Sequence, residues 1–247
     1  MADAMAVFVL VHPAWFGGWC WRKLVPLLRD AGHTVLTPTL TGLGERAHLA
    51  RPEVGLDTHV EDIVSVMTCE DVSEAILVGN SSGGMVITGV ADRVPERVAQ
   101  VVYLDAFAPA HGQSVLDLIP PDRRQAMRAL VEGEGEGWLL PRFSPQPWEQ
   151  FVPAAWHVTD EADLRWVLER LVPTPFGHFS QPVRRDDPRA GKLPRTYVRC
   201  RGWAAPHFDR YAEDARRAGW SCHELDTPHL PYITHPRELA ALLVELA

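Results

Sequence analysis

The chain has 247 residues and a formal net charge of −8, and its 24 basic residues are scattered without forming a basic run. This charge pattern excludes the electrostatic footprint of a protein that binds nucleic acid or an anionic membrane. The length fits one large α/β domain with an insertion, and the composition shows neither disorder nor a fibrous repeat.

The N-terminus has no features of a secretory signal or a membrane anchor. The stretch MADAMAVFVLVHPAWFGGW carries no positive leading segment, and its apolar run VFVLV is too short to span a bilayer. The chain has four widely spaced cysteines and no CxxC pair. We therefore expect a cytoplasmic protein with reduced thiols.

Short apolar segments alternate with helical patterns along the chain. The predicted strands are residues 7–12, 33–39, 75–80, 100–106, 195–200 and 221–226. All but the last are apolar enough for burial on both faces, which is typical of a mainly parallel sheet with helices on both sides. The sequence therefore predicts a doubly wound α/β fold of about six strands.

Helical patterns fill the gaps between these strands. One segment ends at Gly32, one opens after Asp57 as its cap, one follows the GxSxG stretch, one ends at Gly219, and residues 235–247 close the chain. The alternation of strands and helices breaks after Asp105, where the connections become rich in proline.

We interpret residues 109–190 as a cap inserted into a core formed by residues 1–108 and 191–247. Two helical patterns lie in the cap, at 122–133 and 160–172. The cap is rich in large aromatic residues, which suits a cover over an apolar pocket, although ordinary packing explains any single one of them. The predicted substrate-binding residues of the cap are Trp138, Trp148 and Trp156.

The stretch VGNSSGGM at 78–85 contains the G-x-S-x-G pattern, with Ser81 at its centre. The pattern alone is weak, because so short a motif arises by chance. Here it follows a buried-type strand and precedes a helical segment, which is the context of a nucleophile elbow. The helix N-terminus would favour the negative charge that develops in acyl transfer. The sequence therefore predicts Ser81 as a nucleophile.

A serine nucleophile needs a base, because its free hydroxyl is barely ionised at neutral pH. His229 lies in a loop between the last predicted strand and the last helix, which is the position of the base in the chain order Ser, acid, His. His12, His33, His59 and His223 lie in or beside regular elements, where packing or exposure explains them. We expect His229 to be the base.

The predicted oxyanion hole needs two N–H donors. Ser82, the residue after the nucleophile, supplies the first, and the loop HPAWFGGW supplies the second. Pro13 has no N–H, so the second donor should be Ala14, with Trp15 and Phe16 forming one wall of the pocket.

Three segments, VLVHPAWFGGW at 9–19, ILVGNSSGGM at 76–85 and VVYLDAFAP at 101–109, resemble the α/β-hydrolase superfamily. More narrowly, they resemble its branch of plant methyl esterases and hydroxynitrile lyases with their bacterial esterase relatives. The resemblance implies cleavage of a carboxylic ester, with carbamates and amides as further options, through an acyl-enzyme without a metal or organic cofactor. The expected partner is a small-molecule substrate, apolar or aromatic, and the oligomeric state stays open, a homo-oligomer included.

The chain departs from this family at the acid that orients the base, because Trp203 stands near the place where many members carry it. Asp105, Asp209 and Asp226 are the candidates. Asp105 is best placed, because the carboxyl ends of parallel strands meet at one edge of the sheet, where Ser81 also lies. It also resembles the acid of the haloalkane dehalogenases, although capping of the following turn is an alternative role for Asp105.

Two other functions stay open. Hydroxynitrile lyases of this fold hold a cation and a threonine at the site, whereas here Leu230 follows His229 and Pro13 stands at the threonine position. A non-catalytic member of the fold that binds a small ligand is the second alternative, and it would have no need of both Ser81 and His229.

Overall fold

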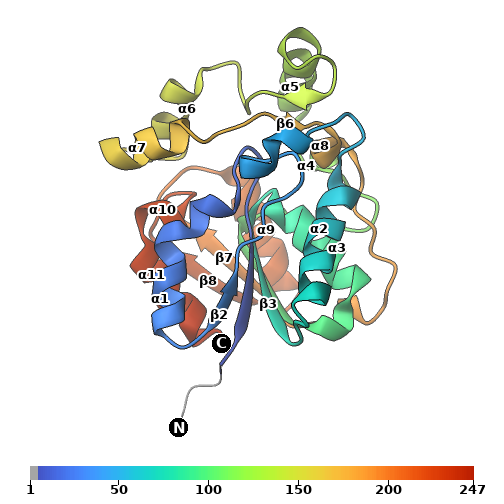
Figure 1. Ribbon diagram of the computed structural model, residues 1–247, viewed down its shortest axis with the longest axis vertical. Helices are drawn as coiled ribbons and strands as arrows, with labels where there is room; N and C mark the ends of the chain where they lie inside the picture. The colour runs from blue at the N-terminus through green and yellow to red at the C-terminus, as the bar shows by residue number, and fades with distance from the viewer. Residues whose placement is uncertain (1–4) are drawn as a thin grey trace.

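A six-stranded parallel sheet forms the centre of the computed structural model, which describes residues 5–247 (Figure 1). The strand order is β2-β1-β3-β4-β7-β8, and each neighbouring pair is parallel. The predicted fold is confirmed. The strands are β1 Val7–Val11, β2 Thr34–Leu36, β3 Ala75–Ser81, β4 Val98–Ala106, β7 Arg195–Cys200 and β8 Ser221–Leu225.

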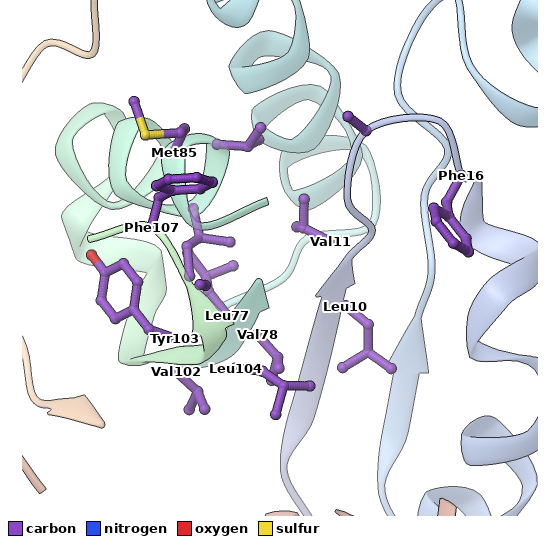
Figure 2. Packing of buried hydrophobic residues seen from close by; sticks show 14 of the residues in the cluster. Leu10, Val11, Phe16, Leu77, Val78, Met85, Val102, Tyr103, Leu104 and Phe107 are labelled. Atoms are coloured by element: carbon purple, nitrogen blue, oxygen red, sulfur yellow. The ribbon is translucent and has the colours of Figure 1, made fainter. Parts of the chain in front are cut away.

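The central strands are apolar on both faces because helices cover both sides of the sheet. Leu77 and Val78 of β3 pack beside Val102 and Leu104 of β4, and all four are fully buried (Figure 2). Phe107, just after β4, lies against the helix that follows the elbow. This packing fixes the positions at which the strands deliver their last residues.

Helices flank the sheet on its two sides (Figure 1). Helices α1 and α11 pack together on one side, and α2 and α3 pack together on the other, while α9 contacts β7 and β8. Their bounds are α1 Leu24–Asp30, α2 Leu56–Cys69, α3 Gly83–Arg93, α9 Pro206–Arg217, α10 Pro231–Thr234 and α11 Pro236–Glu245, with 3₁₀ turns η1 Gly18–Lys23, η2 Gly44–Leu49, η3 Pro95–Arg97 and η4 Ala190–Lys192. None of the helices within residues 5–247 is long and apolar enough to cross a membrane.

The prediction that Asp57 caps helix α2 is wrong. The helix begins at Leu56, and Gly55 is its N-cap. The N–H of Asp57 donates to Gln181 Oε1 at 3.2 Å, so a side chain from a distant segment provides the acceptor. The Asp57 carboxylate instead lies in the first turn, where the helix dipole favours it, and pairs with Arg93 at 3.0 Å.

The segment between β4 and β7 lies over the carboxyl ends of the strands (Figure 1). It contains α4 Val115–Leu118, α5 Pro121–Glu134, α6 Trp148–Ala155, α7 Glu161–Leu168 and α8 Gly177–Ser180, with a two-stranded sheet of β5 Leu139–Leu140 and β6 Thr174–Pro175. Helices α5 and α7 correspond to the two predicted helical patterns. Helix α6 was not predicted, because Pro147 precedes it and Pro153 lies inside it.

Candidate active site

Ser81 lies at a sharp turn between strand β3 and helix α3. Its φ of 53° is left-handed, a conformation that costs about 1–3 kcal/mol and persists only where the surroundings impose it. The turn also needs glycines on either side. A Cβ on Gly79 would lie 2.7 Å from the carbonyl oxygen of Gly83, and a Cβ on Gly83 would lie 2.7 Å from that of Val11. The local sequence therefore forms the elbow that was predicted for it.

Asp105 and His229 meet at the carboxyl end of the sheet. Asp105 is the penultimate residue of strand β4 and is fully buried, and its Oδ2 lies 2.7 Å from Nδ1 of His229. An ionised carboxylate only accepts hydrogen bonds, so Nδ1 carries the proton and Nε2 is left as an acceptor. This is the tautomer that a general base requires.

Three donors from β7 and the loop after it hold the Asp105 carboxylate. Arg199 Nη1 donates to Oδ1 at 2.9 Å, the N–H of Cys200 donates to Oδ1 at 3.2 Å, and Trp203 Nε1 donates to Oδ2 at 2.7 Å. Trp203 stands near the place where the resemblance led us to expect the acid. Here its indole instead orients a carboxylate that comes from another strand.

The cation beside Asp105 is itself deeply buried. Arg199 is 2% exposed, and its Nε donates to Asp209 at 2.8 Å. Burial lowers the pKa of Arg199, but the ion pairs with Asp105 and Asp209 outweigh it and leave that pKa above its usual value. The guanidinium therefore stays charged and balances the negative charge of the buried Asp105 carboxylate.

The other two candidate acids do not contact His229. Asp209 pairs with Arg199 and with Arg201, at 2.8 and 3.1 Å. Asp226 is exposed on the loop before His229. Of the three carboxylates, only Asp105 lies within hydrogen-bonding distance of His229.

The ring and the backbone of His229 are both fixed. The imidazole stacks on Phe208 with ring centroids 5.4 Å apart and contacts Trp203 with centroids 4.4 Å apart. Asn80 Nδ2 donates to the His229 carbonyl at 3.3 Å and to that of Leu104 at 2.9 Å. Asn80 thus ties the elbow to the loop of His229. Sequence reasoning missed this role.

A cavity of about 340 Å³ opens over Ser81 and His229. Two of the predicted wall residues, Trp15 and Trp156, line it together with Ser82. Further lining residues come from the cap and from the loops after β4 and β7, and most are apolar. These residues are Phe107, Val115, Ile119, Pro120, Arg123, Phe143, Phe151, Ala154, Ala155, His157, Phe179, Trp203, Ala204, Ala205, Pro206, His207 and Phe208.

Three of the predicted substrate-binding aromatics do not line this cavity. Phe16 is fully buried behind it, with its ring centroid 5.6 Å from that of Trp156. Trp148 packs against both Trp15 and Trp156, with centroids 5.4 Å apart in each pair. Trp138 belongs to the β5 region, where its carbonyl accepts the N–H of Phe176 at 2.7 Å. The packing of Phe16 and Trp148 explains their aromatic character without contact to a substrate.

The cavity lining includes a guanidinium, that of Arg123, and an imidazole with a strongly shifted pKa, that of His207. Burial, and next the nearby His229, lower the pKa of His207 to about 4, so that this imidazole is neutral at pH 7. The guanidinium of Arg123, on α5, lies over the ring of Phe143, 4.8 Å from the centroid. A cation facing the pocket from this segment was not predicted from the sequence.

Ala14 and Ser82, the two predicted oxyanion donors, are hydrogen-bonded to each other, which was not expected from the sequence. The N–H of Ala14 donates to the side-chain Oγ of Ser82 at 2.9 Å. The N–H of the next residue, Trp15, donates to Thr174 Oγ1 at 2.8 Å. Ala14 is fully buried and does not belong to the cavity lining, whereas Ser82 does.

Comparisons with known proteins agree on one family. A family model described as the alpha/beta hydrolase family matches residues 8–242. A carbendazim hydrolyzing esterase from Nocardioides sp. (strain SG-4G) is 39% identical over 98% of this chain and 100% of its own length. Methylesterase 1 from Arabidopsis thaliana is 26% identical over 97% of this chain and 95% of its own length.

A solved structure shares the same architecture. It is an extracellular alpha/beta-hydrolase from a Paenibacillus species, described as sharing structural and functional homology with tobacco Salicylic Acid Binding Protein 2. Its TM-score to this chain is 0.83, with 25% sequence identity over 97% of this chain and 98% of that one. The matches confirm the resemblance that the motifs indicated, including its esterase branch.

Proposed function

This chain belongs to the alpha/beta hydrolase family, and we propose that it is a serine esterase in which Ser81 is the nucleophile, His229 the base and Asp105 the acid. The observation that carries the proposal is the 2.7 Å contact between His229 Nδ1 and Asp105 Oδ2 beside the strained turn of Ser81. Ser81 and His229 also line one cavity. Its aromatic lining supports a small apolar or aromatic substrate.

The first half of the reaction forms an acyl-enzyme. Ser81 Oγ attacks the ester carbonyl carbon, and its proton passes to Nε2 of His229. Asp105 stabilises the imidazolium that results. The tetrahedral intermediate then collapses, and the alcohol leaves with the proton from His229.

The second half repeats these steps with water. His229 Nε2 takes a proton from a water molecule as its oxygen attacks the acyl carbon, and the carboxylic acid leaves as Ser81 recovers its proton. Catalytic hydrogen bonds are often long in the absence of substrate and tighten when it binds, so the proton transfer from Ser81 to His229 is assigned to the loaded site. The cytoplasmic location and the cap boundaries at 109 and 190 remain predictions from the sequence.

A substrate panel tests the proposal. We expect release of p-nitrophenol from short-chain p-nitrophenyl esters and of methanol from methyl esters of aromatic acids, because both fit an aromatic cavity over Ser81. Carbendazim, other carbamates, lactones and anilides complete the panel, which is followed by liquid chromatography. Anilides should react most slowly, because an amine is a poorer leaving group than an alcohol.

The same panel separates the alternatives. Arg123 brings a cation to the cavity, so mandelonitrile is included, and we expect no cyanide above background. Cyanide release without ester turnover would identify a lyase. Failure of a fluorophosphonate to label Ser81 would instead identify a binding protein.

Arg123 should matter only for substrates that carry a negative charge. Neutral aromatic esters should react faster than half-esters of dicarboxylic acids, because a carboxylate loses hydration on entering the cavity. The Arg123→Leu variant should lower kcat/KM for the half-ester by about fivefold and leave the neutral ester within about twofold, the range of a partly exposed ion pair. Steady-state kinetics on a matched substrate pair measure both effects.

Arg128→Leu is the control for this variant, because Arg128 is exposed on the same helix and does not line the cavity. An equal loss on both substrates in Arg123→Leu would mean that Arg123 supports the packing of Phe143 instead. Half-esters that react as fast as their neutral analogues would contradict the expected preference for uncharged substrates.

A further inference from the structure

Ser82 is the first residue after the nucleophile, and its side chain is placed unusually. It is the N-cap of helix α3, yet its hydroxyl makes no capping hydrogen bond to that helix. A serine at this position ordinarily accepts the N–H of the second or third helical residue. Here Oγ accepts the N–H of Ala14, from the loop after β1, at 2.9 Å. The contact joins the two segments that were predicted from the sequence to supply the oxyanion donors.

In this contact the Ser82 hydroxyl acts only as an acceptor, so its O–H donor remains unused. A serine hydroxyl has one O–H donor and two acceptor lone pairs. Ala14 uses an acceptor position, and within residues 5–247 no group accepts the Ser82 O–H. Ser82 is only 3% exposed and lines the cavity beside Ser81. Its free donor can therefore be used by a group that enters this cavity.

The position of Ala14 also indicates that the Ser82 hydroxyl is the group available to a substrate. Ala14 is fully buried and is not part of the cavity lining, and its N–H is already satisfied by Ser82. In this structure the cavity beside Ser81 is therefore lined by Ser82, which accepts the N–H of Ala14, and not by Ala14 itself. The hydrogen bond from Ala14 polarises that hydroxyl and makes it a stronger donor.

We propose that the Ser82 hydroxyl donates a hydrogen bond to the oxyanion, as a side-chain donor that stands between the substrate and the N–H of Ala14. The inference rests on the proposed esterase function. No covalent bond to Ser82 forms, and its proton stays on Oγ while negative charge builds on the substrate oxygen. The backbone N–H of Ser82 remains the second donor.

Ser82→Ala distinguishes this role from the alternative, in which Ser82 Oγ only prevents the N–H of Ala14 from reaching the oxyanion. If the hydroxyl donates, kcat for a p-nitrophenyl ester should fall by about 100-fold while KM changes less than about threefold, as for loss of one oxyanion donor. Ser82→Thr, which keeps a hydroxyl, should retain more activity than Ser82→Ala. An exposed serine on helix α2, Ser65, gives the control Ser65→Ala.

A transition-state analogue supplies the second readout. Affinity for an arylboronic acid should fall in Ser82→Ala in parallel with kcat, while affinity for the carboxylic acid product stays unchanged. If the alanine variant does not fold, Ser82→Cys keeps the volume with a weaker donor and should show the same selective loss of kcat.

The outcomes separate this inference from the proposed function. A Ser82→Ala enzyme with kcat equal to or above that of wild type would show that Oγ obstructs the hole, and would overturn the inference while leaving the esterase proposal intact. Wild-type protein that cleaves no ester, or retains activity after Ser81→Ala, would overturn the proposed function itself.

Discussion

Replacing Ser81 with alanine should lower kcat for ester cleavage by about 10⁶-fold, the size of effect expected when a serine nucleophile is removed. The variant should remain folded, because the Ser81 hydroxyl makes no hydrogen bond within residues 5–247. Alanine also has a Cβ, so the left-handed turn at φ 53° is no more strained than before. Release of p-nitrophenol measures the rate, and thermal unfolding measures the stability.

The expected pattern includes covalent labelling. A fluorophosphonate should label wild type and the surface variant Ser65→Ala, and should leave Ser81→Ala unlabelled. If Ser81→Ala kept activity within about 100-fold of wild type, the nucleophile would be another residue. An enzyme that has lost its nucleophile retains only background catalysis.

The sheet could be predicted from the sequence because buried strands have a strong local pattern. Residues 7–12 and 195–200 were expected as strands and are observed as Val7–Val11 and Arg195–Cys200. The strand expected at 33–39 ends at Leu36 instead. Pro38 has no N–H to donate to a neighbouring strand, which explains the early end.

The chain positions of Ser81, Asp105 and His229 could also be predicted, because parallel strands deliver their last residues to one edge of the sheet. The 2.7 Å contact between Asp105 and His229 agrees with that placement. Their catalytic roles remain predictions that the variants described here test.

The groups around Asp105 could not be predicted. Trp203 and Asp105 are 98 residues apart in the chain, and no local pattern connects them. Arg199 lies in a strand whose neighbours are apolar, and only the fold shows that its charge pairs with Asp105 and Asp209 inside the protein. Hydrophobic patterning cannot predict a buried arginine, because it takes no account of ion pairs.

The lining of the cavity was predicted only in part, for a related reason. A high aromatic content predicts a cap over an apolar pocket, but it does not predict which aromatic rings face that pocket. Trp15 and Trp156 line the cavity, whereas Trp148 packs against them. The assignment depends on helix α6, which the prolines of that segment conceal from sequence analysis.

Asp105→Asn should lower kcat by about 10⁴-fold with little change in KM, by analogy with the same change in serine proteases. An asparagine amide can donate to His229 Nδ1 and so favours the tautomer that carries the proton on Nε2. That tautomer cannot take the proton of Ser81. The neutral amide also fails to stabilise the imidazolium as it forms.

The structure adds a cost in stability to this prediction. Asp105 and Arg199 are both buried, and loss of one partner of a buried pair costs about 3 kcal/mol of unfolding free energy when nothing else compensates the remaining charge. Asp209 still pairs with Arg199 at 2.8 Å, so the loss should be smaller. Kinetics should therefore be measured well below the lowered Tm, with folding checked by circular dichroism.

Asp209→Asn and Asp226→Asn are the matched controls, and both should keep kcat within about tenfold of wild type, because neither carboxylate contacts His229. Asp209→Asn should lower Tm more than Asp226→Asn, since Asp209 pairs with the buried Arg199 while Asp226 is exposed on a loop. This ordering separates a structural role from a catalytic one. A near-wild-type Asp105→Asn enzyme beside a crippled Asp209→Asn or Asp226→Asn enzyme would show that the 2.7 Å contact between Asp105 and His229 does not orient the base.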